Sequence, residues 1–215
     1  MQNEIKEKTT LLTYDGRLAV RGFAKHLVFD YDRTSVARPG RLKEWDFYQI
    51  TDGDYVLQMN MSDIYYFSTV SVTLFNLKTG KKYSAAINHF YSKGRLNLEK
   101  NGEDDHVTTY TDKDFLMRFD VHQDTRHLSL NAVDDVGQQF IVDLWLYAPP
   151  SSQAMVIATP FKNPRQFFLN YKLNCMRAIG TVTIGDIVVH FGEKAFGLLD
   201  WGRGVWPFKN QWFWG

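Results

Sequence analysis

Alternation of apolar and polar residues with a period of two is the pattern that most constrains this chain. It runs through residues 54–61, 115–122 and 138–147, and it places every second side chain on the same face of an extended strand. Residues 64–77 add a long run of Tyr, Val, Thr and Phe, which suit a pleated surface. No amphipathic helix longer than about three turns is present in the pattern. We therefore predict an all-β, antiparallel barrel or sandwich.

Turn-forming dipeptides separate the predicted strands at short intervals. Asn101-Gly102 tolerates the positive φ angles of a type I′ turn, so it predicts a hairpin after a strand at residues 95–100. Gly185-Asp186 predicts a second short hairpin.

Two consecutive prolines mark the predicted domain boundary. Pro149 and Pro150 lack the backbone N–H that a central strand must donate. They predict a first β half at residues 1–150 and the beginning of a second, incomplete β half at residues 151–215.

Charge and cysteine content exclude several classes of protein. The 25 Lys and Arg residues balance 24 Asp and Glu residues, whereas a protein that tracks nucleic-acid phosphates normally has a basic excess. The N-terminal residues contain no apolar run that could serve as a signal peptide, and no segment approaches the ~20 apolar residues of an integral membrane helix. Cys175 is the single cysteine, so the chain forms no internal disulfide. These features predict a cytoplasmic protein without a nucleic-acid partner.

Tryptophan is concentrated at the C-terminal end. Four of the six tryptophans lie in the last fifteen residues: Trp201, Trp206, Trp212 and Trp214. Free termini are normally polar, and exposed aromatic segments promote unwanted strand pairing. We therefore expect a missing C-terminal segment, or a partner that covers this aromatic end.

The first candidate site is a pair of acidic residues beside a phenol. In a strand, Glu44, Asp46 and Tyr48 share one face, and Trp45 lies on the other. Burial near an apolar pocket would raise the pKa of such a carboxyl group and suit it to general acid catalysis. A solvated strand face with ordinary charges is the alternative.

The second candidate site is a polar row in a predicted strand. Asn170, Lys172 and Asn174 share one face, whereas Leu173 and Cys175 share the other. If the polar row points into a lumen, it offers donors to a ligand. If that face is exposed to solvent, the row is simply the polar side of an amphipathic strand. Cys175 is predicted to be an inert, buried thiol.

The third candidate site embeds two charges among aromatic residues. Asp200 and Arg203 are expected to pair, because an isolated charge in such surroundings is costly to desolvate. Gly202 and Gly204 would allow tight backbone turns around them. Asp200 could donate a proton or accept a ligand bond while Arg203 tunes it, or the two could form a structural ion pair. The aromatic residues predicted to contact a ligand here are Trp201 and Trp206.

The histidines point to neither a metal nor a cofactor. His122 and His127 flank a predicted turn, but no Cys, His or Asp spacing matches a metal-binding template. We therefore predict no metal site and no cofactor.

Three motifs carry a resemblance to a known family. Residues 41–48, 170–176 and 199–207 resemble, in the same order, a bacterial family described as domain of unknown function 2804. The resemblance implies further residues after the tryptophan-rich motif. More remotely, the chain is similar to lipocalin-like (calycin) proteins that include carotenoid hydratases and tocopherol cyclase. That similarity implies a ligand cavity built from two barrel-like halves.

Two main functional hypotheses follow. The first is that an aromatic-lined cavity binds an apolar small molecule, such as a lipid or isoprenoid. The second is an enzyme that protonates, hydrates or cyclises an unsaturated apolar substrate, in which Asp200 or Glu44 donates the proton and Lys172 or Arg203 tunes it. A purely structural or assembly protein is the third possibility. The residues assigned to ligand binding are Lys172, Asn170, Asn174, Trp45, Asp46, Tyr48, Trp201 and Trp206.

Overall fold

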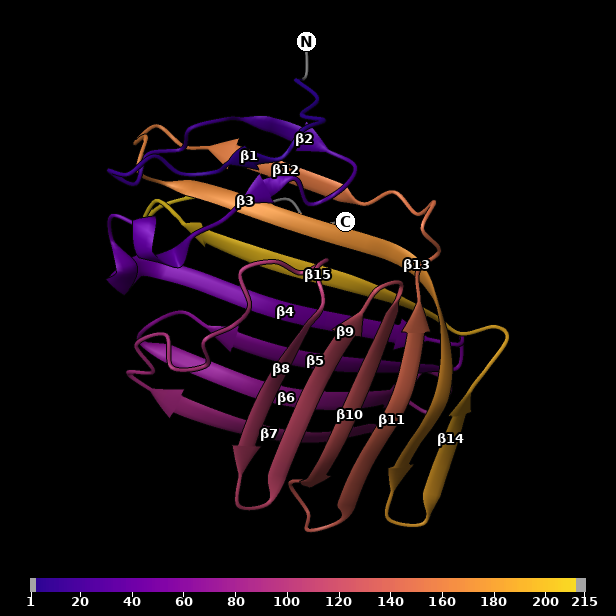
Figure 1. Ribbon diagram of the computed structural model, residues 1–215. Helices are drawn as coiled ribbons and strands as arrows, with labels where there is room; N and C mark the ends of the chain where they lie inside the picture. The colour runs from indigo at the N-terminus through magenta and orange to yellow at the C-terminus, as the bar shows by residue number, and fades with distance from the viewer. Residues whose placement is uncertain (1–2, 212–215) are drawn as a thin grey trace.

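β-Strands make up nearly all of the regular secondary structure of the described residues (Figure 1), as the alternation predicted. The computed structural model describes residues 3–211. Within this range, no helix is long and apolar enough to cross a bilayer. The elements are β1 (Thr9–Thr10), β2 (Gly22–Ala24), β3 (Phe29–Asp30), η1 (Arg33–Ser35), η2 (Pro39–Arg41), β4 (Leu42–Thr51), β5 (Tyr55–Asp63), β6 (Phe67–Asn76), β7 (Lys82–Phe90), β8 (His106–Asp112), β9 (Phe115–His122), β10 (Thr125–Val133), β11 (Gln139–Tyr147), β12 (Met155–Pro160), β13 (Phe167–Ile184), β14 (Ile187–Phe191) and β15 (Phe196–Val205).

One large antiparallel sheet contains most of these strands. Its order is β7-β6-β5-β4-β15-β13-β11-β10-β9-β8, with β12, β2 and β14 attached around β13. The sheet therefore contains two meanders, β4–β7 and β8–β11. Strands β15 and β13 lie between β4 and β11 and join the two meanders, although β7 precedes β8 directly in the sequence. The all-β, antiparallel fold class is confirmed. Strands β13 and β15, which follow residue 150, lie at the centre of the sheet order.

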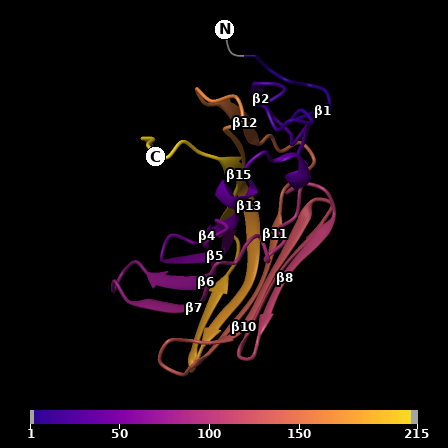
Figure 2. The ribbon, with the colours of Figure 1, turned by 90° about the vertical axis from the view of Figure 1, so that its left-hand side faces the viewer.

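The core lies between the two meanders, which Figure 2 shows on opposite sides of β13. The ring centroids of Tyr48 in β4 and Phe119 in β9 are 4.9 Å apart, in an edge-to-face contact. Alternate residues of both meanders point into this space, so that Leu57, Met59 and Met117 are fully buried. Side chains therefore fill the space between the two meanders.

A bulge in β13 overturns the prediction for Cys175. Pairing with β15 loses its register between Leu173 and Met176, and Cys175 has a φ angle of 61°. The extra residues in a bulge leave the regular alternation. Cys175 and Asn174 are consequently exposed, whereas a buried thiol had been predicted.

The two hairpin predictions had different outcomes. Gly185-Asp186 forms the turn between β13 and β14, as predicted. The predicted hairpin at Asn101-Gly102 is wrong, because residues 95–105 form a loop without strands. The Asn101 side chain instead accepts a bond from the Glu103 backbone N–H at 2.7 Å, so the dipeptide turns the loop locally.

Gly180 is expected to be essential to the geometry of β13. Its φ angle is 140°, and an added Cβ would lie 2.1 Å from the Asp143 backbone oxygen in β11. We expect Gly180→Ala to lower the free energy of unfolding by about 1–3 kcal/mol through strain and backbone displacement. Urea-induced unfolding measures the change. Gly192→Ala is the matched control, because its added Cβ meets nothing within 4 Å, and an equal loss in both variants would contradict the argument.

Candidate functional site

Pairing of β4 with β15 brings two of the three predicted motifs together. Glu44 lies directly opposite Arg203 in the ladder, and Asp46 lies opposite Trp201. The prediction that Glu44, Asp46 and Tyr48 share one face is confirmed, and all three are buried. A solvated face, the alternative for these residues, is therefore wrong.

The predicted pairing of Asp200 with Arg203 is wrong. Residues three positions apart on a strand point to opposite faces. Arg203 therefore points into the interior, whereas Asp200 points to the outer face. The two charges find separate partners and form two separate clusters.

The interior cluster is organised by Arg203, whose side chain is completely buried. Its Nη2 donates to Asp46 Oδ1 at 2.8 Å and to the Glu99 carbonyl at 2.7 Å, while Nε lies 3.5 Å from Glu44 Oε1. The guanidinium carbon lies 4.0 Å from the centre of the Trp201 ring. Arg203 is thus paired with two carboxylates and covered by an aromatic face, as a buried cation requires.

Glu44 accepts hydrogen bonds from two further residues of the interior cluster. It accepts bonds from the Tyr31 hydroxyl and from Arg33 Nε, each at 2.9 Å. Burial and the nearby Glu44 carboxylate raise the pKa of Tyr31 well above its ordinary value. Arg33 also donates to the Leu98 carbonyl, so the interior cluster holds the loop at residues 95–105 in place. These contacts support a structural function for the interior cluster.

The outer cluster is organised by Asp200. Lys172 lies opposite Asp200 in the β13–β15 ladder, and its Nζ donates to Asp200 Oδ2. Asn170 Nδ2 and Trp45 Nε1 donate to Oδ1 at 2.8 and 3.2 Å. Asp200 is only 6 % exposed, whereas the Lys172 side chain is 23 % exposed. One ammonium and two N–H donors therefore surround a single buried carboxylate.

Three aromatic rings border the outer cluster. The centroid of Trp45 lies 5.5 Å from that of Trp206 and 5.6 Å from that of Phe168, and Phe168 lies 4.8 Å from Trp206. Lys43 Nζ lies 5.6 Å from the centre of the Trp206 ring. We call this surface the outer-face site, and its members are Trp45, Phe168, Asn170, Lys172, Asp200 and Trp206.

The glycines of β15 are needed for close packing and not for turns. Gly202 lies inside the strand, and an added Cβ would come within 2.2 Å of the Trp45 ring. An added Cβ on Gly204 would lie 2.4 Å from the Phe167 backbone oxygen. The prediction of tight turns at these glycines is therefore wrong: the missing side chain lets Trp45 pack closely over Gly202 and lets β13 approach β15 closely at Gly204.

The remaining predicted residues lie apart from the outer-face site. Asp46, Tyr48 and Trp201 point into the core. The polar row of β13 does not point into a lumen, because Asn170 and Lys172 lie on the face opposite the core, and Asn174 is exposed at the bulge. Trp212 and Trp214 lie outside the described residues.

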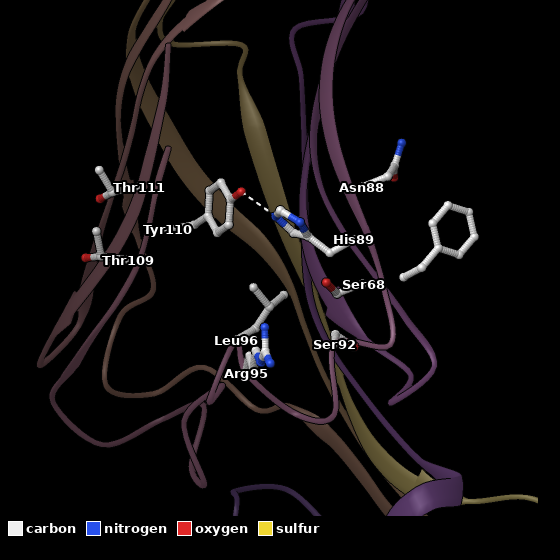
Figure 3. A pocket seen from close by; sticks show the side chains of 10 residues that line it. Ser68, Asn88, His89, Ser92, Arg95, Leu96, Thr109, Tyr110 and Thr111 are labelled. Carbon is white, nitrogen blue, oxygen red and sulfur yellow. Dashed lines mark hydrogen bonds between the residues drawn. The ribbon is translucent and has the colours of Figure 1, made fainter. Parts of the chain in front are cut away.

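A pocket of ≈ 390 Å³ lies at the seam between the two end strands of the sheet, and the sequence did not indicate it (Figure 3). His89 from β7 and Tyr110 from β8 point toward each other, with Nε2 and the hydroxyl 2.7 Å apart. Burial, followed by the nearby Asp112 carboxylate, raises the pKa of Tyr110 to about 12. His89 and Tyr110 meet only because the sheet curls, so no local spacing could reveal them. Within residues 3–211, no group of three acidic, His or Cys side chains is placed to hold a metal ion.

The family model described as "Domain of unknown function (DUF2804)" matches residues 2–215. This chain belongs to the DUF2804 family. The three motifs that suggested the family lie in β4, β13 and β15, so they meet at the outer-face site and the interior cluster. Comparison with curated proteins gave no match for this DUF2804 chain.

Solved structures match this chain at low sequence identity. A protein described as AttH from Nitrosomonas europaea is 10 % identical, with a TM-score of 0.48 over 79 % of this chain and 53 % of that one. Kievitone hydratase from Nectria haematococca is 11 % identical, with a TM-score of 0.41 over 75 % of this chain and 47 % of that one. CghA, solved with Sch210972, is 13 % identical, with a TM-score of 0.32 over 77 % and 46 % of the two chains. The DUF2804 chain thus spans about half the length of each of these structures.

Proposed function

We propose that the outer-face site binds an apolar small molecule, lipid- or isoprenoid-like, that carries one polar group. The observation that carries this proposal is the juxtaposition of three aromatic rings with the nearly buried Asp200 and its three donors. Flat rings supply apolar area at little cost in side-chain entropy. The Lys172–Asp200 pair and Asn170 supply the few polar groups that orient a mostly apolar ligand.

Partial exposure of the rings supports binding at this face. Trp45 and Phe168 are only half-buried although they contact Trp206, which is 4 % exposed. Half-buried aromatic residues beside a buried ion pair leave apolar area to be covered. The Lys172 side chain is 23 % exposed, so this polar group lies at the edge of the aromatic surface.

Removal of the rings is expected to weaken binding. With farnesol as the probe, we expect Trp45→Ala combined with Phe168→Ala to weaken binding by at least about tenfold, because each ring contributes roughly 1 kcal/mol. Quenching of tryptophan fluorescence, supported by native mass spectrometry, measures the affinity. Trp145→Ala is the matched control, because Trp145 is 49 % exposed and stacks on His127 in the other meander. Equal affinities in the two variants would count against the outer-face site.

An enzyme that protonates, hydrates or cyclises an unsaturated apolar substrate is the second candidate function. The specific observation in its favour is the Lys172–Asp200 pair, because Asp200 also accepts a bond from Trp45, whose ring packs against Trp206 and could stabilise positive charge. Asp200 accepts from three donors, so its geometry suits orientation of Lys172 better than donation of its own proton.

Asp200→Asn separates the two candidate functions. The probe is geranylgeraniol, and mass spectrometry with chromatography detects addition of water or formation of cyclic isomers. Farnesol binding that persists while product formation is lost supports the enzyme. If Asp200→Asn forms product at the original rate, Asp200 has no part in the mechanism. If the unaltered chain forms no product, binding is the supported function.

A further inference from the structure

A separate pocket of ≈ 230 Å³ contains a buried cation at its base. It is lined by Arg126 at the start of β10, by Tyr171 and Leu173 of β13, and by Glu103 and Asp124. Tyr171 and Leu173 point to the face of β13 opposite Asn170 and Lys172, so this pocket is distinct from the outer-face site. The pocket volume is smaller than that of typical pockets for drug-sized ligands, and it suits a small metabolite.

Arg126 lacks the partners that a buried guanidinium normally has. It is 2 % exposed, and among residues 3–211 it has no carboxylate in ion-pair contact. Its Nη2 donates over long distances to the Gly102 carbonyl at 3.3 Å and to the Tyr171 hydroxyl at 3.5 Å, and the guanidinium also interacts with the buried Tyr48 hydroxyl, so all its described partners are neutral oxygens. Its Nε has no acceptor among the described residues. An uncompensated buried cation is costly, so a bound anion would relieve the cost.

Arg203 provides an internal comparison. It is equally buried, but it contacts the carboxylates of Glu44 and Asp46 and two backbone carbonyls. The fold therefore supplies carboxylates to one buried arginine and leaves the other facing a pocket. Among residues 3–211, the Arg126 guanidinium therefore has no carboxylate in direct contact, and a ligand carboxylate would fill that position.

The other charges of the pocket restrict what the ligand can be. Glu103 is held by the Leu27 backbone N–H at 2.6 Å and lies 3.3 Å from His26 Nδ1. Asp124 lines the same pocket, and within the described part of the chain its carboxylate makes no hydrogen bond or ion pair. These two carboxylates would repel a ligand that carries only negative charge. A ligand with an ammonium group next to its carboxylate satisfies both ends of the pocket.

We infer that this pocket binds a small zwitterion of the α-amino-acid class. The carboxylate of the ligand contacts the Arg126 guanidinium and the Tyr171 hydroxyl, and its ammonium group faces Asp124 and Glu103. Guanidinium–carboxylate bonds are the strong, directional contacts that fix the ligand at the base. Selectivity over simple carboxylates then comes from the acidic residues that also line the pocket.

The test uses the full chain with L-alanine, acetate and methylamine as probes in titration calorimetry and thermal unfolding. We expect L-alanine to bind and to raise the unfolding midpoint, with acetate and methylamine each weaker by at least about tenfold. Failure of L-alanine to bind at millimolar concentration overturns the inference. Acetate that binds as tightly as L-alanine also overturns it.

Two variants locate the bound amino acid. Asp124→Asn is expected to weaken L-alanine binding by about tenfold without moving the unfolding midpoint of the free protein, whereas Asp186→Asn in the exposed β13–β14 turn has no effect. Arg126→Met is expected to abolish binding while leaving the free protein as stable as before or more so, because it removes an uncompensated charge. Binding that survives Arg126→Met, or that is lost in Lys172→Met at the outer-face site, refutes the assignment.

Discussion

Replacement of Arg203 by methionine is expected to lower the free energy of unfolding by about 3–5 kcal/mol. The variant would leave the carboxylates of Glu44 and Asp46 buried without the guanidinium that compensates them. It would also leave the Glu99 carbonyl without its donor and so release the loop at residues 95–105. Equilibrium unfolding in urea, monitored by tryptophan fluorescence and by circular dichroism, measures the loss.

Two further variants make the Arg203 result interpretable. Arg118→Met removes a partly exposed arginine that pairs with Asp120, and we expect it to cost no more than about 1 kcal/mol. Combining Arg203→Met with Glu44→Gln and Asp46→Asn should restore part of the lost stability, because the uncompensated charges are then neutral. Similar losses for Arg118→Met and Arg203→Met, or a triple variant weaker than Arg203→Met alone, would contradict the structural function of the interior cluster.

Truncation of Phe119 to alanine is expected to cost a similar amount, about 3–5 kcal/mol. Phe119 is 1 % exposed and makes the edge-to-face contact with Tyr48 that joins the two meanders across the core. Its removal leaves a cavity between two layers that are held apart by the rest of the sheet. Urea-induced unfolding again provides the measurement.

Leu116→Ala is the matched control for Phe119→Ala. Leu116 lies in the same strand but on the opposite face, where it is 44 % exposed. We expect a change within about 0.5 kcal/mol at this surface position. If both variants lose the same stability, β9 does not present Phe119 to a shared core, and the two-layer arrangement is wrong.

The two buried arginines respond oppositely in these experiments. Arg203→Met should destabilise the free protein, whereas Arg126→Met should not, although both remove a buried guanidinium. The difference arises because the cost depends on which charges are left unpaired. Of the two arginines, only Arg203 has carboxylate partners among residues 3–211. The pair of measurements therefore tests whether a buried arginine serves the fold or a ligand.

Local sequence patterns were enough to predict most strands and, within each strand, the sorting of side chains onto two faces. A period of two is a local property of extended backbone, so the shared face of Glu44, Asp46 and Tyr48 could be predicted without any knowledge of neighbours. The same rule, applied strictly, would also have separated Asp200 from Arg203. The hairpin at Gly185-Asp186 was predictable for the same reason, because its turn depends on adjacent residues alone.

Which of these faces meet depends on long-range strand pairing in the folded chain. Pairing of β15 with both β4 and β13 brings Trp45, Asn170 and Lys172 to Asp200, and these contacts join residues up to 155 positions apart. The bulge at Cys175 and the loop at Asn101-Gly102 departed from local preference, because long-range packing outweighs the small energies of turn and strand propensity. The seam pocket and the uncompensated Arg126 likewise exist only because the sheet curls on itself, since burial and charge pairing are properties of the folded chain.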